Sequence, residues 1–151
     1  MIALVAHHWH GYGPWRGTHE FFRREHEPER RPGNSPGDAQ TVAFIAANTP
    51  PMQNGHYLLR RGQTAQERTW TDLQEPLAWL TGMYAQCPPD PTLSYGTPGD
   101  WLEYTELSLR HGGDAIWHYT TSKNGNRVVT YAVISCPHRH LSEIPCPLPP
   151  N

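Results

Sequence analysis

Histidines are the residues of this chain with the clearest potential for chemistry, because ten of them occur among 151 residues. Two pairs, His8 with His10 and His138 with His140, have the i, i+2 spacing that places both side chains on one side of an extended strand. Neutral imidazoles bind zinc, iron, nickel and copper. If the first and last strands are parallel neighbours in the sheet, these four histidines could therefore bind one divalent transition metal. Antiparallel strands would separate the two pairs.

The cysteines offer an alternative set of ligands. Cys136 and Cys146 flank His138 and His140, and the four could form a structural zinc site in the Pro-rich C-terminal segment. With Cys87, the chain has three cysteines, an odd number without close pairing. This usage indicates a reduced, intracellular setting, which we interpret as the cytoplasm.

A second candidate site follows from strand register. If residues 112–113 and 124–125 are two-residue hairpin loops, His118 lies opposite Tyr131, and Glu103 shares their face of the sheet. A half-buried histidine beside a tyrosine hydroxyl suits proton transfer. His118 would then be the general acid or base, Tyr131 its hydroxyl partner and Glu103 the carboxylate that orients the imidazole. Alternatively, His118 and Tyr131 simply form a hydrogen bond at the rim of the core.

Aromatic residues suggest a binding surface. Trp9, Tyr12 and Trp15 alternate with glycines near the N-terminus, and Trp101 follows a Pro- and Gly-rich stretch. Tryptophan and tyrosine dominate both ligand pockets and protein interfaces. These four side chains are therefore predicted to line either a small-molecule pocket or the contact surface of a protein partner.

Composition excludes several classes of protein. The net charge of −2 argues against a nucleic-acid partner, which requires clustered basic residues. No stretch approaches 18 apolar residues, so we expect neither a membrane span nor a membrane partner. The 16 prolines and 13 glycines predict long ordered loops between short strands.

The pattern of apolar residues predicts the elements that position these side chains. We expect an α+β fold, with a curved antiparallel sheet of five to six strands packed on one main helix and able to form a half-open barrel. A single domain spans 1–151, with a Pro-rich tail over 137–151. Thr18 is expected to cap a short helix that extends to about Glu25, and the main helix covers 71–86. Strands are expected at 2–9, 41–47 (where a helix capped by Asp38 is the alternative) and 56–61, and a C-terminal three-stranded meander at 101–110, 115–122 and 127–136.

Two functions from different classes fit these features. The first is a small intracellular enzyme or ligand-binding protein, acting on a small molecule in a pocket lined by histidines and aromatic rings. The second is a protein-binding module, such as an inhibitor or an immunity-type protein, without catalytic activity. An exposed sheet edge would also allow a homodimer. The sequence does not decide between the enzyme and the binding module.

Overall fold

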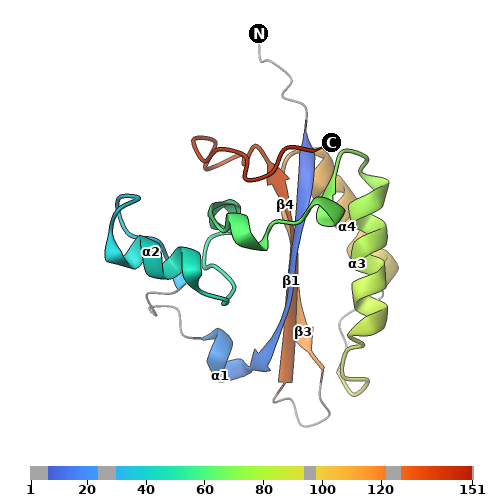
Figure 1. Cartoon of the computed structure of the whole chain (residues 1–151). Coiled ribbons are helices and arrows are strands. Elements are labelled where there is room, and N and C mark those ends of the chain that lie inside the picture. The colour runs from blue at the N-terminus through green and yellow to red at the C-terminus, as the bar shows by residue number, and fades with distance from the viewer. Residues whose placement is uncertain (1–6, 24–29, 94–97, 122–126, 151) are drawn as a thin grey trace.

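A four-stranded antiparallel sheet forms the centre of the computed structural model, which describes residues 7–23, 30–93, 98–121 and 127–150 (Figure 1). Its strands lie in the order β2-β1-β4-β3. The α+β class and the antiparallel sheet are therefore confirmed. The prediction of five to six strands is wrong for the described part of the chain, and the sheet does not close into a barrel. The strands are β1 (His8–Thr18), β2 (Thr69–Trp70), β3 (Ala115–Thr120) and β4 (Arg127–Cys136).

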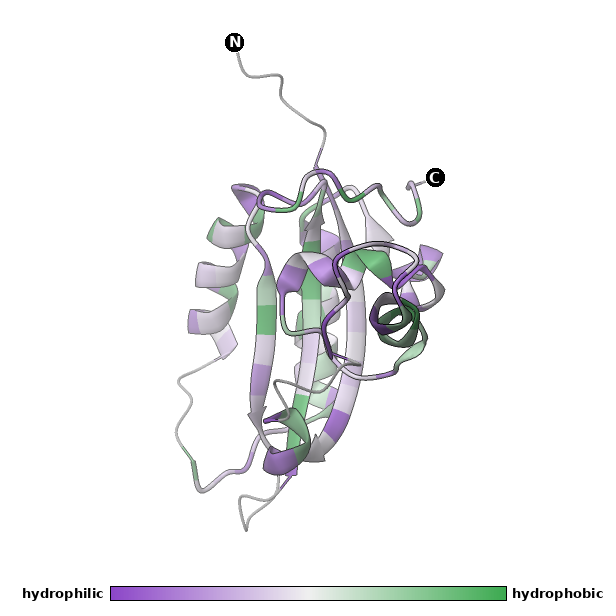
Figure 2. Ribbon diagram, turned by 90° about the vertical axis from the view of Figure 1, so that its left-hand side faces the viewer, coloured by the Kyte–Doolittle hydropathy of each residue, from purple (hydrophilic) through white to green (hydrophobic). Residues whose placement is uncertain are grey.

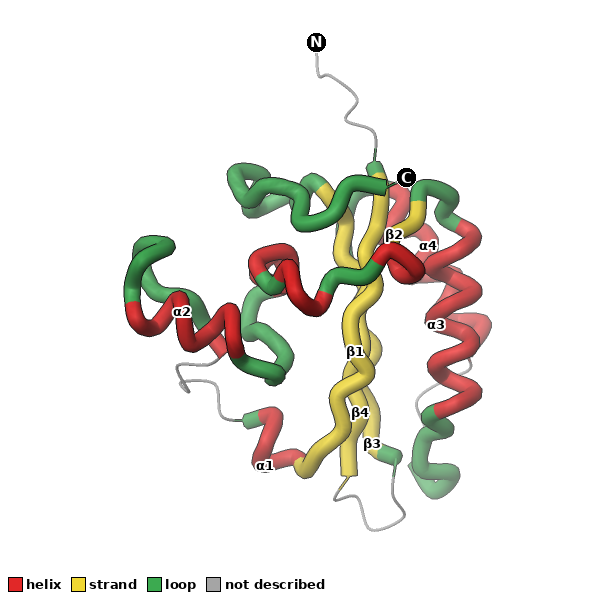
Figure 3. Tube along the Cα trace, viewed as in Figure 1, coloured by secondary structure: helices red, strands yellow, loops and turns green. Residues whose placement is uncertain are grey.

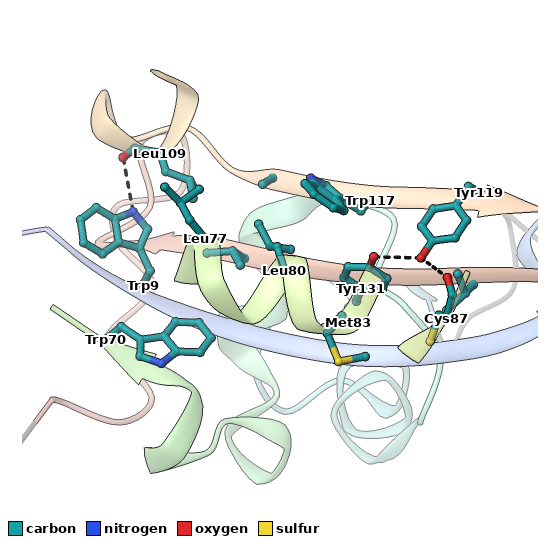
Figure 4. Close-up of a cluster of buried hydrophobic side chains, with 13 residues drawn as sticks. Trp9, Trp70, Leu77, Leu80, Met83, Cys87, Leu109, Trp117, Tyr119 and Tyr131 are labelled. Carbon is teal, nitrogen blue, oxygen red and sulfur yellow. Dashed lines mark hydrogen bonds between the residues drawn. The ribbon is translucent and has the colours of Figure 1, made fainter. Parts of the chain in front are cut away.

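Two helices, α3 (Gln74–Gln86) and α4 (Pro98–Arg110), cover one face of the sheet (Figures 1 and 3). The main core lies between them and the strands, where Leu80, Leu109 and Tyr131 are fully buried (Figure 4). Helix α3 confirms the helix predicted over 71–86, although it begins at Gln74. Pro76 lies in the first turn, where backbone N–H groups have no partner within the helix, so the missing N–H of proline costs no helical bond.

The opposite face is covered by short helices and by the C-terminal segment, residues 137–150 (Figure 2). Tyr12, Tyr57 and Ile134 form a second core there. Thr18 caps the first helix as predicted, because its hydroxyl accepts a hydrogen bond from the backbone N–H of Phe21. The elements are α1 (His19–Phe22), α2 (Ala39–Ala46) and the 3-10 helices η2 (Asn54–Leu59), η3 (Arg61–Gln63) and η4 (Gln66–Arg68).

The predicted three-stranded meander is wrong, because its first strand is helix α4. Trp101, Thr105 and Leu109 recur every four residues, and Thr105 and Leu109 are buried. This spacing gives one apolar stripe on a helix, and packing that stripe against the sheet decides the conformation. The strands expected at 41–47 and 56–61 are likewise helices, α2 and η2, with Asp38 at the N-cap position of α2.

The register of the β3–β4 hairpin differs by one residue from the prediction. Trp117 lies opposite Tyr131, and His118 lies opposite Thr130. This register places Trp117, Tyr119 and Tyr131 together beneath the helices, so that burial of three aromatic rings selects it. The loop expected at 124–125 lies outside the described residues. Residues 112–113 connect α4 to β3 and do not form a hairpin loop.

Strand β1 begins at His8 and continues through Gly11 and Gly13, beyond the end of the strand predicted at 2–9, of which residues 2–6 lie outside the described residues. Gly11 allows close packing, since a Cβ atom there would lie 2.7 Å from the ring of Trp70. Gly13 has a φ of +96° at the irregularity between Tyr12 and Trp15, where the register with β4 shifts. These glycines therefore maintain the long central strand.

Candidate metal centre

Four potential metal ligands meet where β1 begins and β4 ends. His8 and His10 lie on the same face of β1, because side chains two residues apart point the same way. Cys136 is the last residue of β4 and is the cross-strand partner of His8. The fourth ligand, Cys146, comes from the C-terminal segment that crosses this end of the sheet.

The distances within this His/Cys cluster are close to those of a tetrahedral site. The four ligand atoms all lie within 4.8 Å of one another. The Sγ atom of Cys146 lies 3.3 Å from Nε2 of His8 and 3.7 Å from Nε2 of His10. A tetrahedral zinc ion, with Zn–S of about 2.3 Å and Zn–N of about 2.0 Å, separates sulfur from nitrogen by about 3.5 Å. The two distances from Cys146 fit these values, and the cluster could bind a metal ion if its widest separation, up to 4.8 Å, contracted by about 1 Å.

A threonine from the neighbouring strand fixes the orientation of His10. Nδ1 of His10 lies 2.9 Å from the hydroxyl of Thr69, which itself donates to the carbonyl of Ala65 at 2.8 Å. Because the hydroxyl proton is used in the second bond, the Thr69 oxygen accepts from an Nδ1–H of His10. The lone pair is then on Nε2, which faces Cys146. Metal-binding histidines characteristically have such a partner for the second ring nitrogen.

Burial disfavours the charged forms of His10 and Cys136. Desolvation, assisted by neighbouring His8, lowers the pKa of His10 to about 4. Burial and neighbouring Cys146 raise the pKa of Cys136 to about 12. A divalent cation would change this balance, since two thiolates neutralise its charge and two neutral imidazoles complete the coordination.

Comparisons with known proteins identify no relative. No family model, no curated protein and no solved structure matches the chain. None of the helices in the described part of the chain is both long and apolar enough to cross a lipid bilayer. The chemistry of the side chains is therefore the guide to function.

The structure brings together two of the four ligands from each predicted set. These are His8 and His10 from the histidine set, and Cys136 and Cys146 from the set with cysteines. Strands β1 and β4 are antiparallel, which was expected to separate the histidine pairs. However, His8 and His10 begin their strand, so they lie beside the end of β4 and meet Cys136 and Cys146. Sequence reasoning proposed each of these four residues but never as one set, because the pairing of β1 with β4 was unknown.

His138 and His140 are outside the cluster. Nε2 of His138 donates to Oδ2 of Asp114 at 2.7 Å, and its Nδ1 accepts from the backbone N–H groups of His140 and Leu141 at 3.2 Å each. Both ring nitrogens of His138 are thus engaged, and the His140 side chain is exposed. The buried His138–Asp114 pair instead anchors the C-terminal segment to the start of β3.

The three predicted catalytic residues do not converge. The hydroxyl of Tyr131 lies 2.9 Å from that of Tyr119 in the core beneath α3 and α4 (Figure 4). His118 points to the other face of the sheet, where its ring contacts Phe22 at a centroid distance of 5.3 Å. Glu103 is exposed on α4. The one-residue difference in register therefore removes the geometry on which this site was argued.

The four aromatic residues predicted to bind a ligand lie in separate places. Trp9 is buried on the helix-covered face, where its indole N–H donates to the carbonyl of Leu109 at 3.3 Å. Tyr12 and Trp15 belong to the second core on the opposite face. Trp101 is on α4, and its ring packs at 5.2 Å from that of Trp117. All four contribute to packing, and they do not line one common pocket.

Proposed function

We propose that this chain is a zinc-binding protein in which a structural zinc ion holds the C-terminal segment on the sheet. The ligands are His8, His10, Cys136 and Cys146. One observation carries the proposal, namely the convergence of two imidazoles and two thiols within 4.8 Å. Structural zinc sites are closed by four protein ligands, whereas catalytic sites keep one position open for water or substrate.

The donor set favours zinc over other cations. Calcium and magnesium require oxygen ligands, and the cluster offers none. Two sulfurs and two nitrogens in a tetrahedron are typical of zinc. The complex with two thiolates is neutral, which suits a site in which His10 and Cys136 are almost completely buried.

The topology of the ligands indicates what the ion would stabilise. His8, His10 and Cys136 lie on neighbouring strands, whereas Cys146 belongs to a segment without helix or strand. Ile144, two residues before Cys146, packs against the second core around Tyr12. A bond from zinc to Cys146 would therefore hold this part of the segment over the core.

The same chemistry favours a reducing compartment, and we therefore propose the cytoplasm as the site of action. Zinc binds thiolates, and oxidation of Cys136 and Cys146 to a disulfide would remove both sulfur ligands. Reducing conditions keep such thiols available.

Elemental analysis of the untagged protein, purified without chelators, tests the proposal directly. We expect about one zinc ion per chain, and much less in the variants Cys136→Ser, Cys146→Ser and His10→Gln. Two matched controls, Cys87→Ala and His140→Gln, should retain the metal because Cys87 lies in the other core and the His140 side chain is exposed.

Cobalt replacement provides a second readout of the same site. Tetrahedral cobalt bound to two thiolates gives intense visible bands and a sulfur-to-metal charge-transfer band. We expect the second band to weaken when either Cys136 or Cys146 is replaced by serine. Metal-free wild-type protein that also fails to take up zinc or cobalt under reducing conditions would refute the proposal.

A further inference from the structure

A cavity of about 310 Å³ opens beside His118 on the face of the sheet that carries α1 and η2. None of its lining residues belongs to the His/Cys cluster. Four basic side chains from three separate stretches of the chain border it, and these are His19, Arg23, Arg30 and His118. The cavity is thus independent of the proposed zinc site.

The described residues that line this cavity carry charges of one sign. None of the described residues that line it is acidic. Arg30 is buried and held in place, because its guanidinium donates to the carbonyls of Pro50 at 2.8 Å and Phe22 at 2.7 Å. Burial lowers the pKa of His118, and the neighbouring His19 and Arg30 lower it further. The cationic groups on the described walls of the cavity would attract an anion.

The remaining walls define the shape of the ligand. Phe22, Pro51 and Met52 supply apolar surface, and the amide of Asn54 supplies a neutral hydrogen-bonding group. A volume of this size accommodates a small ligand. Apolar walls beside a cationic end suit a molecule with one anionic group on a short apolar body.

We propose that this cavity binds a small organic anion, whose carboxylate or phosphate group is held by His19, His118 and Arg23. Protonated imidazoles and a guanidinium form charge-assisted hydrogen bonds with such oxygens. The positive charge of the buried Arg30 adds to the attraction, and the apolar part of the ligand contacts Phe22 and the neighbouring wall.

Binding should strengthen as the pH falls, since only protonated imidazoles carry charge. Among the described residues, the groups facing His118 are His19 from α1, Arg23 directly after that helix, Arg30, and the neutral Tyr57 from η2. On its other side, His118 borders a second cavity together with Asp100 and Asp114. Asp114 is engaged by His138 and by the backbone N–H of Ser135. The basic groups on the cavity side of His118 therefore dominate the pH dependence of anion binding.

Calorimetry with benzoate, phenyl phosphate and benzyl alcohol tests the proposal with the full chain. At about pH 5.5, below the usual histidine pKa, we expect one of the two anions to bind and the neutral alcohol to bind at least about tenfold more weakly. The preferred anion identifies a carboxylate or a phosphate as the natural group. Affinity for benzoate, which stays a monoanion over this range, should fall several-fold when the pH is raised to about 7.5.

Variants locate the site. His118→Gln and Arg23→Gln should each weaken anion binding about tenfold. The matched controls His111→Gln and Arg61→Gln remove the same charges from side chains that do not line the cavity, and they should bind as the wild type does. Because the exchanged side chains are exposed, far-ultraviolet circular dichroism should report a folded protein in every case. Failure of both anions to bind, or equal losses in the controls, would overturn the proposal.

Discussion

Removal of the zinc ion should measurably destabilise the protein. The ion would cross-link His10 near the start of the described chain to Cys136 near its end. Closing a loop of about 125 residues lowers the entropy of the unfolded chain by an amount worth about 5 kcal/mol. For a chain of 151 residues, this corresponds to a decrease of about 10–20 °C in melting temperature.

Urea and thermal denaturation of matched samples would measure this effect. The wild type is compared with zinc bound and after chelation, at a constant concentration of reductant that keeps the thiols free. The variant Cys146→Ser should start near the stability of the chelated wild type and respond little to chelator. Cys87→Ala removes a buried thiol from the other core, so it should be less stable overall but lose as much stability as the wild type on chelation.

The reasoning fails if chelation leaves the wild-type transition unchanged although the protein had bound zinc. It also fails if Cys146→Ser loses as much stability on chelation as the wild type does. The first result would mean that the ion does not link the two ends of the chain, and the second that Cys146 is not one of its ligands.

Three further predictions follow from neighbouring contacts. Thr69→Val removes the partner of Nδ1 of His10 and should lower zinc affinity about 10–100-fold in competition with a metal indicator; unchanged affinity would contradict this orienting role. Asp114→Ala removes two hydrogen bonds from a buried carboxylate and should cost about 3 kcal/mol in urea unfolding, and a stability equal to the wild type would contradict the anchor. Burial and nearby groups raise the pKa of Tyr119 from its usual value near 10 to about 12, so the folded state holds this proton more tightly than the unfolded state. The contribution of Tyr119 to the free energy of unfolding should be fully present below about pH 10 and should decline towards pH 12. Urea unfolding and tyrosinate absorbance would measure this decline, and Tyr119→Phe should reduce it.

The fold class could be predicted from the sequence, but several elements could not. Helix α3 and the strands β3 and β4 have patterns that match one conformation. The stretch 101–110 also alternates like a strand, yet Trp101, Thr105 and Leu109 equally define a helical stripe. Local patterns cannot choose between the two periods, and the choice is made by packing against the sheet.

The metal ligands show a similar limit. The i, i+2 spacing of His8 and His10 correctly indicated two imidazoles on one side of a strand. Their partner on the other strand, Cys136, depended on a pairing between residues more than 120 positions apart, which spacing does not reveal. His138 and His140 have the same spacing, but His138 forms a hydrogen bond with Asp114 and lies outside the cluster.

The register that aligns His8 with Cys136 does not itself require a metal ion. Trp9 lies between the two histidines and buries its ring on the opposite face, so a slip of one residue would remove the tryptophan from the main core and place both imidazoles beneath α3 and α4. Burial of Trp9 therefore selects the alignment of His8, His10 and Cys136 before any ion is bound. Only Cys146 lies outside the sheet. We infer that metal loss would loosen the C-terminal segment first, and that amide hydrogen exchange after chelation would increase over 141–150 while the centres of β1 and β4 stay protected.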